Sequence, residues 1–187
     1  LKNIEGLTGL PITSLPATVV VDKQEITIGE NGSIEIVIRI PVDNEETRPY
    51  LPKGATVTEE DLSKGIAIKD SNNNEWTWII VPKSEMPEGL TFEEVSDYIT
   101  LETALQTYAS NYRSSYKDEW YDGCGLEEDE YELLKQSMLK SVYENGGFYI
   151  GKYEVGSFDN PVTAPDTTRK AVIQKGAYPY NYVPCEK

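Results

Sequence analysis

Apolar and polar residues alternate over positions 18–42, on both sides of an Asn-Gly turn at 29–33. The alternating apolar positions are Val19, Val21, Ile26, Ile28, Ile34, Ile36, Ile38 and Ile40. Successive side chains of a strand point to opposite faces, and Asn-Gly between alternating runs is the strongest short-range hairpin signal. The segment therefore predicts a β-hairpin with isoleucines on one face. An isolated hairpin is marginal in water, so we expect this face to contact the core; an interaction surface is the alternative.

A second hairpin is predicted from residues 65–69 and 75–81, joined by the turn Asp70–Asn74. Asp and Asn side chains bond their own backbone and tolerate left-handed conformations, which explains the turn without a ligand. The segment imitates the start of a calcium-binding loop. An EF-hand would need Gly at its sixth position and Glu at its twelfth, where this chain has Glu75 and Val81. A hairpin turn is therefore the better interpretation.

Two helices are predicted, over residues 100–112 and 127–144. The apolar stripes that indicate them are Leu101, Leu105, Tyr108 and Tyr112 in the first helix and Tyr131, Leu134, Met138 and Val142 in the second. Acidic residues open the second helix and Gly146 closes it, an order that suits the helix dipole. A strand at 148–155 and another at 170–175 are also expected.

Together these patterns predict an α+β chain of antiparallel hairpins and two main helices. Residues 1–17 read as an arm and residues 43–48 as a polar linker, so we divide the chain into an N-terminal arm and hairpin (1–47) and an α+β domain (48–187).

Charge and composition exclude several classes of function. The 187 residues carry a net charge of −15, which repels nucleic acid and anionic membranes. No apolar run is long enough to span a bilayer. Because the chain begins with Leu1, we expect an export signal to have been removed and the protein to be extracellular or on the cell surface. The cysteines, Cys124 and Cys185, allow one disulfide or two unlinked thiols.

Few residues suggest chemistry. The chain has no histidine, which removes the usual general base and zinc ligand, and we expect no catalytic, metal or cofactor site. The acidic run at 127–130 is a metal candidate, but a solvated first helical turn explains it better. Exposed indoles would make a sugar platform, whereas on an inner face they are core. The candidate ligand or partner surface consists of Trp76, Trp78, Trp120, Tyr178, Tyr180 and Tyr182.

Four segments, taken in order, resemble the front half of formylglycine-generating-enzyme-like domains found in gut Firmicutes. They are Pro49–Gly54, Trp76–Pro82, Lys140–Val155 and Lys175–Val183. The resemblance covers about three quarters of the chain and implies a C-type-lectin-like fold. In the family, the copper-binding cysteine pair and the calcium ligands lie beyond the matching part, and Cys185 does not match an active-site cysteine. The resemblance thus implies a fold without the activity.

The leading hypothesis is a non-catalytic extracellular or cell-surface binding module for a protein or a glycan. The alternative is an assembly component, such as an appendage or prophage protein, that uses the N-terminal hairpin for subunit contacts. A residual enzyme built on carboxylates is the third. A domain that has only its front half would leave strand edges unpaired, and such edges favour pairing with another chain, including a second copy.

Overall fold

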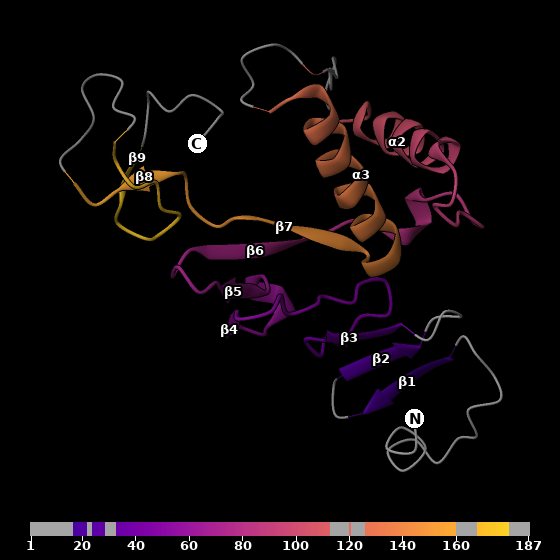
Figure 1. Ribbon diagram of the computed structural model, residues 1–187, viewed down its shortest axis with the longest axis horizontal. Helices are drawn as coiled ribbons and strands as arrows, with labels where there is room; N and C mark the ends of the chain where they lie inside the picture. Colours follow the sequence, from indigo (N-terminus) through magenta and orange to yellow (C-terminus); the bar gives the residue numbers. More distant parts are fainter. Residues whose placement is uncertain are drawn as a thin grey trace.

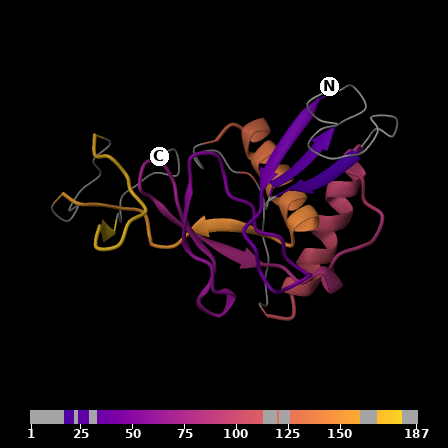
Figure 2. The same cartoon turned by 90° about the horizontal axis from the view of Figure 1, so that it is seen from below.

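The computed structural model describes residues 17–21, 24–28, 33–112, 120, 126–159 and 168–179 (Figure 1). Two α-helices and antiparallel sheets make up the described part, so the predicted α+β class is confirmed. A small N-terminal sheet and a longer central sheet lie below the helix pair in Figure 1. In Figures 1 and 2 the short strands β8 and β9 lie at the opposite end of the central sheet from the helices.

The N-terminal sheet contains three antiparallel strands, β1 (Ala17–Val21), β2 (Gln24–Ile28) and β3 (Ile34–Ile38). Pairing of β2 with β3 confirms the hairpin, while the expected first arm is divided into two strands. The expected core contact of the isoleucine face is wrong for β3. Ile34, Ile36 and Ile38 are 54%, 59% and 41% exposed, and Ile40 is buried. On the opposite face, Glu25 of β2 is buried and Val37 and Arg39 are half-buried, whereas Glu35 is exposed.

The central sheet has the order β4 (Thr56–Glu59), β5 (Ala67–Lys69), β6 (Glu75–Ile80), β7 (Gly147–Gly151), all antiparallel. Pairing of β5 with β6 confirms the second hairpin. Its turn is closed by Asp70, whose carboxylate accepts bonds from the Asn72 and Asn74 amides and from the Trp76 indole. Burial raises the pKa of Asp70, but these hydrogen bonds outweigh it and lower the pKa. The Asp70 side chain therefore bonds to the backbone of its own turn, as predicted.

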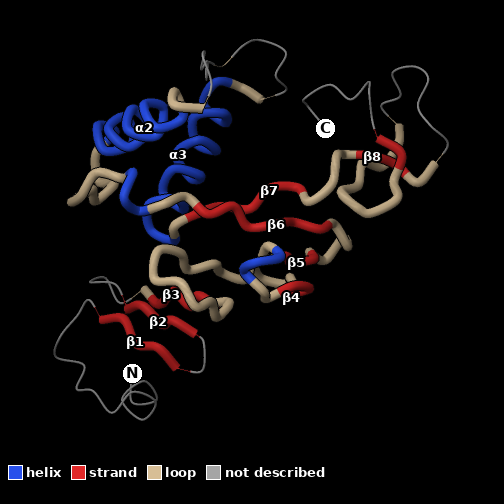
Figure 3. The backbone as a smooth tube through the Cα atoms, turned by 180° about the vertical axis from the view of Figure 1, so that it is seen from behind, coloured by secondary structure: helices blue, strands red, loops and turns tan. Residues whose placement is uncertain are grey.

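Two long helices lie side by side at one end of the central sheet (Figures 1 and 3). Helix α2 spans Val95–Ala109, so it begins five residues earlier and ends three residues earlier than the predicted 100–112. Helix α3 spans Glu128–Asn145, with Glu127 and Glu130 forming a capping box and Gly146 in the left-handed conformation. The expected inner stripe of α3 is wrong in part: Leu139 and Val142 are buried, but Leu134 and Met138 are exposed.

The core lies between the central sheet and the segment that connects it to the N-terminal sheet. Ile40, Ile66, Ile68 and Trp78 form its buried centre. Short 3₁₀ turns, η1 (Leu62–Lys64) and η2 (Lys83–Glu85), connect the elements. The strand expected at 148–155 is shorter in the structure, and is followed by β8 (Gly156–Ser157), which pairs with β9 (Tyr178–Pro179). The strand expected at 170–175 is not formed; Val172 makes a single bridge to Gly156.

Residues 43–48, expected to be a polar linker, lie between the two sheets and also pack against the protein. Thr47 is buried, and its hydroxyl accepts a 2.7 Å bond from the Trp78 indole. The amide of Arg48 donates to the carbonyl of Asn145, at the end of α3. This connection therefore carries buried contacts to both the sheet and the helix. The division of the chain at residue 47 remains a prediction.

The turn before α2 leads to a prediction about acid stability. The Asp97 carboxylate accepts bonds from the amides of Thr91 and Phe92, which lower its pKa, and Phe92 has a φ of 60°. A carboxyl whose pKa is lower in the folded than in the unfolded protein stabilises the fold at pH values above its unfolded pKa, which is about 4. This stabilisation is lost as the pH falls through the lower pKa of the folded protein. We expect Asp97→Asn to lower the urea midpoint at pH 7.

The same variant should also lose less stability than the wild type between pH 5 and pH 2. Glu93→Gln removes the same charge from an exposed neighbour and is the control. Urea unfolding followed by circular dichroism at several pH values measures both effects. Parallel pH profiles for wild type and Asp97→Asn would contradict the assignment.

Candidate functional site

An apolar groove lies between α3 and the edge of the central sheet. Its volume is about 480 Å³. The lining residues are Tyr50, Tyr131, Leu134, Lys135, Ser137, Met138, Ser141, Phe148, Tyr149 and Ile150. Phe148, Tyr149 and Ile150 are consecutive in β7, so their side chains alternate between the two faces of the sheet. A groove that contacts all three runs along the edge of the strand.

The large exposed side chains of the groove are apolar. Leu134, Met138 and Ile150 are 61%, 40% and 42% exposed. The charged residue in the lining, Lys135, lies 3.0 Å from Glu132 and 3.6 Å from Glu102, so its charge is paired. The groove therefore favours an apolar ligand that brings little charge of its own.

Hydrogen bonds and ring contacts hold the walls of the groove. The Ser141 hydroxyl, from α3, donates to the carbonyl of Gly147 at 2.8 Å. The Tyr149 hydroxyl donates to the carbonyl of Tyr50 at 2.7 Å, and its ring lies edge-on against Trp78 and Tyr50. Burial raises the pKa of Tyr149, so this phenol stays neutral and keeps its donor. These contacts position β7 before any ligand arrives.

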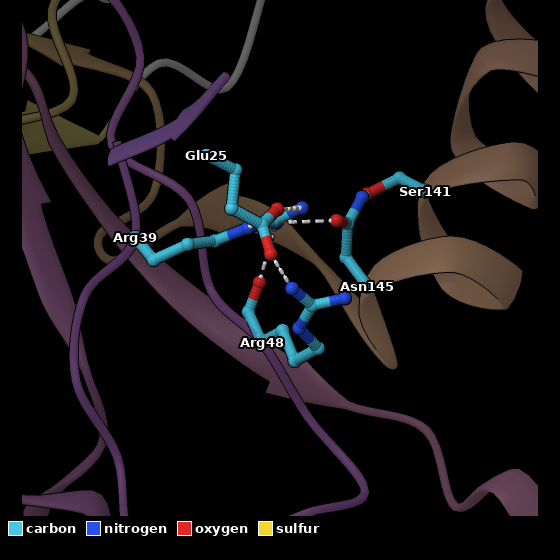
Figure 4. A network of polar contacts seen from close by, with 5 residues as sticks. All are labelled: Glu25, Arg39, Arg48, Ser141 and Asn145. Carbon is cyan, nitrogen blue, oxygen red and sulfur yellow. Dashed lines mark hydrogen bonds and ion pairs between the residues drawn. The ribbon is translucent and has the colours of Figure 1, made fainter. Parts of the chain in front are cut away.

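A polar cluster fixes the N-terminal sheet beside the same helix (Figure 4). The buried carboxylate of Glu25 accepts a 2.7 Å bond from Arg39 Nε and forms ion pairs with Arg39 and Arg48. Arg39 also donates to the Asn145 side chain at 2.6 Å and to the Arg48 carbonyl at 2.9 Å. Burial lowers the pKa of Arg39, against the pull of Glu144 and Glu35. Each charged group has a partner, so the cluster is structural.

The six predicted surface aromatics do not form one site in the described part of the chain. Trp78 is buried, so the core interpretation is confirmed for it and a platform role is wrong. Trp76 and Trp120 are half-buried, and their indoles donate to Asp70 and to the Leu126 carbonyl. Tyr178 is exposed in β9. The remaining predicted site residues, Tyr180, Tyr182, Cys124 and Cys185, lie outside the described residues.

The acidic run at the start of α3 acts as a helix cap. Glu130 accepts a bond from the amide of Glu127, and the side chain of Glu127 accepts one in return from the backbone of Glu130. Across the described residues, no three acidic or cysteine side chains are grouped as metal ligands. The interpretation of this run as a first helical turn is supported by the capping geometry.

Sequence reasoning missed the groove as a site because its lining comes from three separated regions. A signal was present: α3 carries more large apolar residues than one buried stripe needs, including the adjacent Leu133 and Leu134. Both leucines are exposed, but only Leu134 lines the groove.

No protein-family model, curated protein or solved structure matches this chain. Neither helix of the described part combines the length and the apolar character needed to cross a bilayer.

Proposed function

We propose that this protein is a non-catalytic binding module, extracellular or on the cell surface, and that the groove between α3 and β7 binds a polypeptide partner. The exposed apolar side chains of Leu134, Met138 and Ile150, around a cavity in which the charge of Lys135 is paired, carry the proposal. Transfer of apolar side chains of a partner from water into such a site lowers the free energy of the complex. Apolar contacts near the centre of an interface supply most of the binding energy.

A protein ligand suits this groove better than a glycan. Sugar sites present the faces of exposed aromatic rings, whereas Trp78 is buried here, the Tyr and Phe rings that line the groove are half-buried, and its large exposed side chains are not aromatic. The hydroxyl of Ser141 is bonded to Gly147, and Lys135 is paired with two acids, which also disfavours a Ser-Lys catalytic pair in the groove.

The relationship to formylglycine-generating-enzyme-like domains, with their C-type-lectin-like fold, is part of the proposal. It rests on the motifs in the sequence and would be consistent with a binding role, because such a fold can carry sites of many kinds. Copper-dependent oxidation of a sulfatase-derived peptide by this protein would contradict the non-catalytic part.

Two neighbouring leucines allow a matched test of the groove. Peptides selected from a phage-displayed library against the purified chain serve as the probe. Leu134→Lys places a charge in the groove and should weaken peptide binding about tenfold or more, the effect of losing one central contact. Leu133→Lys makes the same change at a similarly exposed position outside the lining and should leave affinity within about twofold.

Calorimetry or fluorescence anisotropy measures these affinities. Because both leucines are more than 60% exposed, neither variant should unfold the protein. Equal affinities for the two variants would place the binding site elsewhere.

A second candidate function is an assembly component, and the outward isoleucines of β3 favour it. Ile34, Ile36 and Ile38 form an exposed apolar row on a sheet that is anchored through its other face. If copies pack through this row, light scattering should detect oligomers at high concentration that Ile36→Lys abolishes and Glu35→Gln, on the opposite face, does not. A strict monomer at high concentration would count against this function.

A further inference from the structure

The free edge of β7 can be derived from the hydrogen bonds at its two ends. The amide of Val81 donates to the Gly146 carbonyl, and the amide of Lys152 donates to the Glu75 carbonyl. In an antiparallel ladder the bonded positions recur every second residue. Residues 148 and 150 therefore direct their backbone groups toward β6, whereas Gly147, Tyr149 and Gly151 direct theirs away from it. The Gly147 carbonyl confirms this phase, because it accepts the Ser141 hydroxyl from the α3 side.

Within the described residues, the backbone groups of Tyr149 on this edge have no partner. β7 has β6 as its neighbour in the sheet, and nothing in the described part of the chain bonds to the amide or the carbonyl of Tyr149 on the other side. The open stretch is short. Ser141 closes it at Gly147, and the side chain of Ile173 lies against Gly151 at the other end. An unpaired backbone edge beside an apolar groove is the arrangement that an added strand fits.

We propose that an extended segment of a separate partner protein adds as a strand to the free edge of β7, bonds to the backbone of Tyr149 and places alternate side chains in the groove under α3. This inference rests on the proposed function and specifies its ligand. A helical ligand would satisfy its own backbone and leave Tyr149 unpaired, so the edge favours an extended segment.

Charge distinguishes a separate partner from a second copy. The chain carries −15, so two copies repel one another at low ionic strength, whereas a basic partner is attracted. The lining itself has no unpaired charge, since Lys135 is held by Glu102 and Glu132. We therefore expect the inserted segment to be apolar at its alternate positions and its flanks or parent protein to be basic.

Amide hydrogen exchange on the ¹⁵N-labelled full chain tests the mode of binding. The probe is a peptide selected from the library above, studied with a set of analogues that carry one N-methyl group at successive positions. Binding should slow exchange of the Tyr149 amide by about tenfold or more, as expected when an exposed amide gains a stable hydrogen bond. N-methylation should weaken binding about tenfold at the one peptide position whose N–H donates to the Tyr149 carbonyl, and only slightly at the positions on either side of it.

Each outcome separates this inference from the proposed function. A peptide that loses affinity in Leu134→Lys but leaves Tyr149 exchange unchanged would overturn strand addition and keep the groove as a binding site. Loss of affinity at consecutive N-methylated positions would also overturn it. Selections that yield no ligand sensitive to Leu134→Lys would overturn both. Slow Tyr149 exchange in the free protein, with a dimer in light scattering, would show that a second copy occupies the edge and contradict a separate partner.

Discussion

Gly146→Ala is expected to lower the free energy of unfolding by about 3 kcal/mol or more, which combines the cost of a left-handed backbone with that of overpacking. Gly146 has a φ of +69°, and a β-carbon there would lie 2.0 Å from the Glu46 carbonyl oxygen and 2.9 Å from Thr47 Cα. The obstructing atoms belong to the backbone, so they cannot move aside as a flexible side chain could. The variant should therefore separate the end of α3 from the segment at 46–47.

Gly54→Ala is the matched control for this prediction. Gly54 has a φ of +82° but nothing lies within 4 Å of the added carbon, so only the backbone cost remains, about 1 kcal/mol. Chemical denaturation of the two variants measures the difference. Equal losses would show that the close approach of residues 46 and 146 contributes nothing to stability.

Glu25→Gln is expected to cost about 3 kcal/mol, the lower end of what the loss of one partner from a buried ion pair costs. The carboxylate is buried between Arg39 and Arg48, and the neutral amide would leave the half-buried Arg39 guanidinium without its counterion. Arg48 is about half exposed and can turn to water, which limits the loss. Hydrogen exchange should rise first in β2 and β3, because the cluster anchors that sheet to α3.

A surface pair and a double variant give the controls. Lys140→Gln breaks the pair with Glu144, in which both side chains are about half exposed, and should change stability by less than about 0.5 kcal/mol. Glu25→Leu combined with Arg39→Met should recover part of the loss, since apolar residues can replace a buried ion pair. Equal losses for Glu25→Gln and Lys140→Gln would contradict a buried role for Glu25.

Local chemistry in the sequence was enough to predict several elements. The turn at Asp70–Asn74 forms as expected because the Asp70 carboxylate bonds to its own neighbours. Helix α3 is capped by Glu127 and Glu130 and ends at Gly146, close to its expected limits. In each case the deciding contacts join residues that are a few positions apart, so the pattern itself contains the information.

The orientation of the faces depended on contacts between distant residues. Alternation in β3 reveals two faces but does not say which of them lies against the protein. Arg39 bonds to Glu25 and also to Asn145, which is 106 positions away in the sequence. These bonds hold the face that carries Arg39 against the protein and leave the isoleucines of β3 exposed. The stripe of α3 was likewise misplaced in part, because packing buries Leu139 and leaves Leu134 and Met138 beside an open strand edge.

By itself, the sequence of this protein determined its α+β class, the turn at Asp70–Asn74 and the ends of α3, because those features depend on neighbours along the chain. Only the tertiary structure decided which strand is left as an edge and where the groove lies. The groove is lined by Tyr50, α3 and β7, which are far apart in the sequence. Packing and backbone hydrogen bonds between distant segments bring them together, so no local sequence pattern predicts the groove.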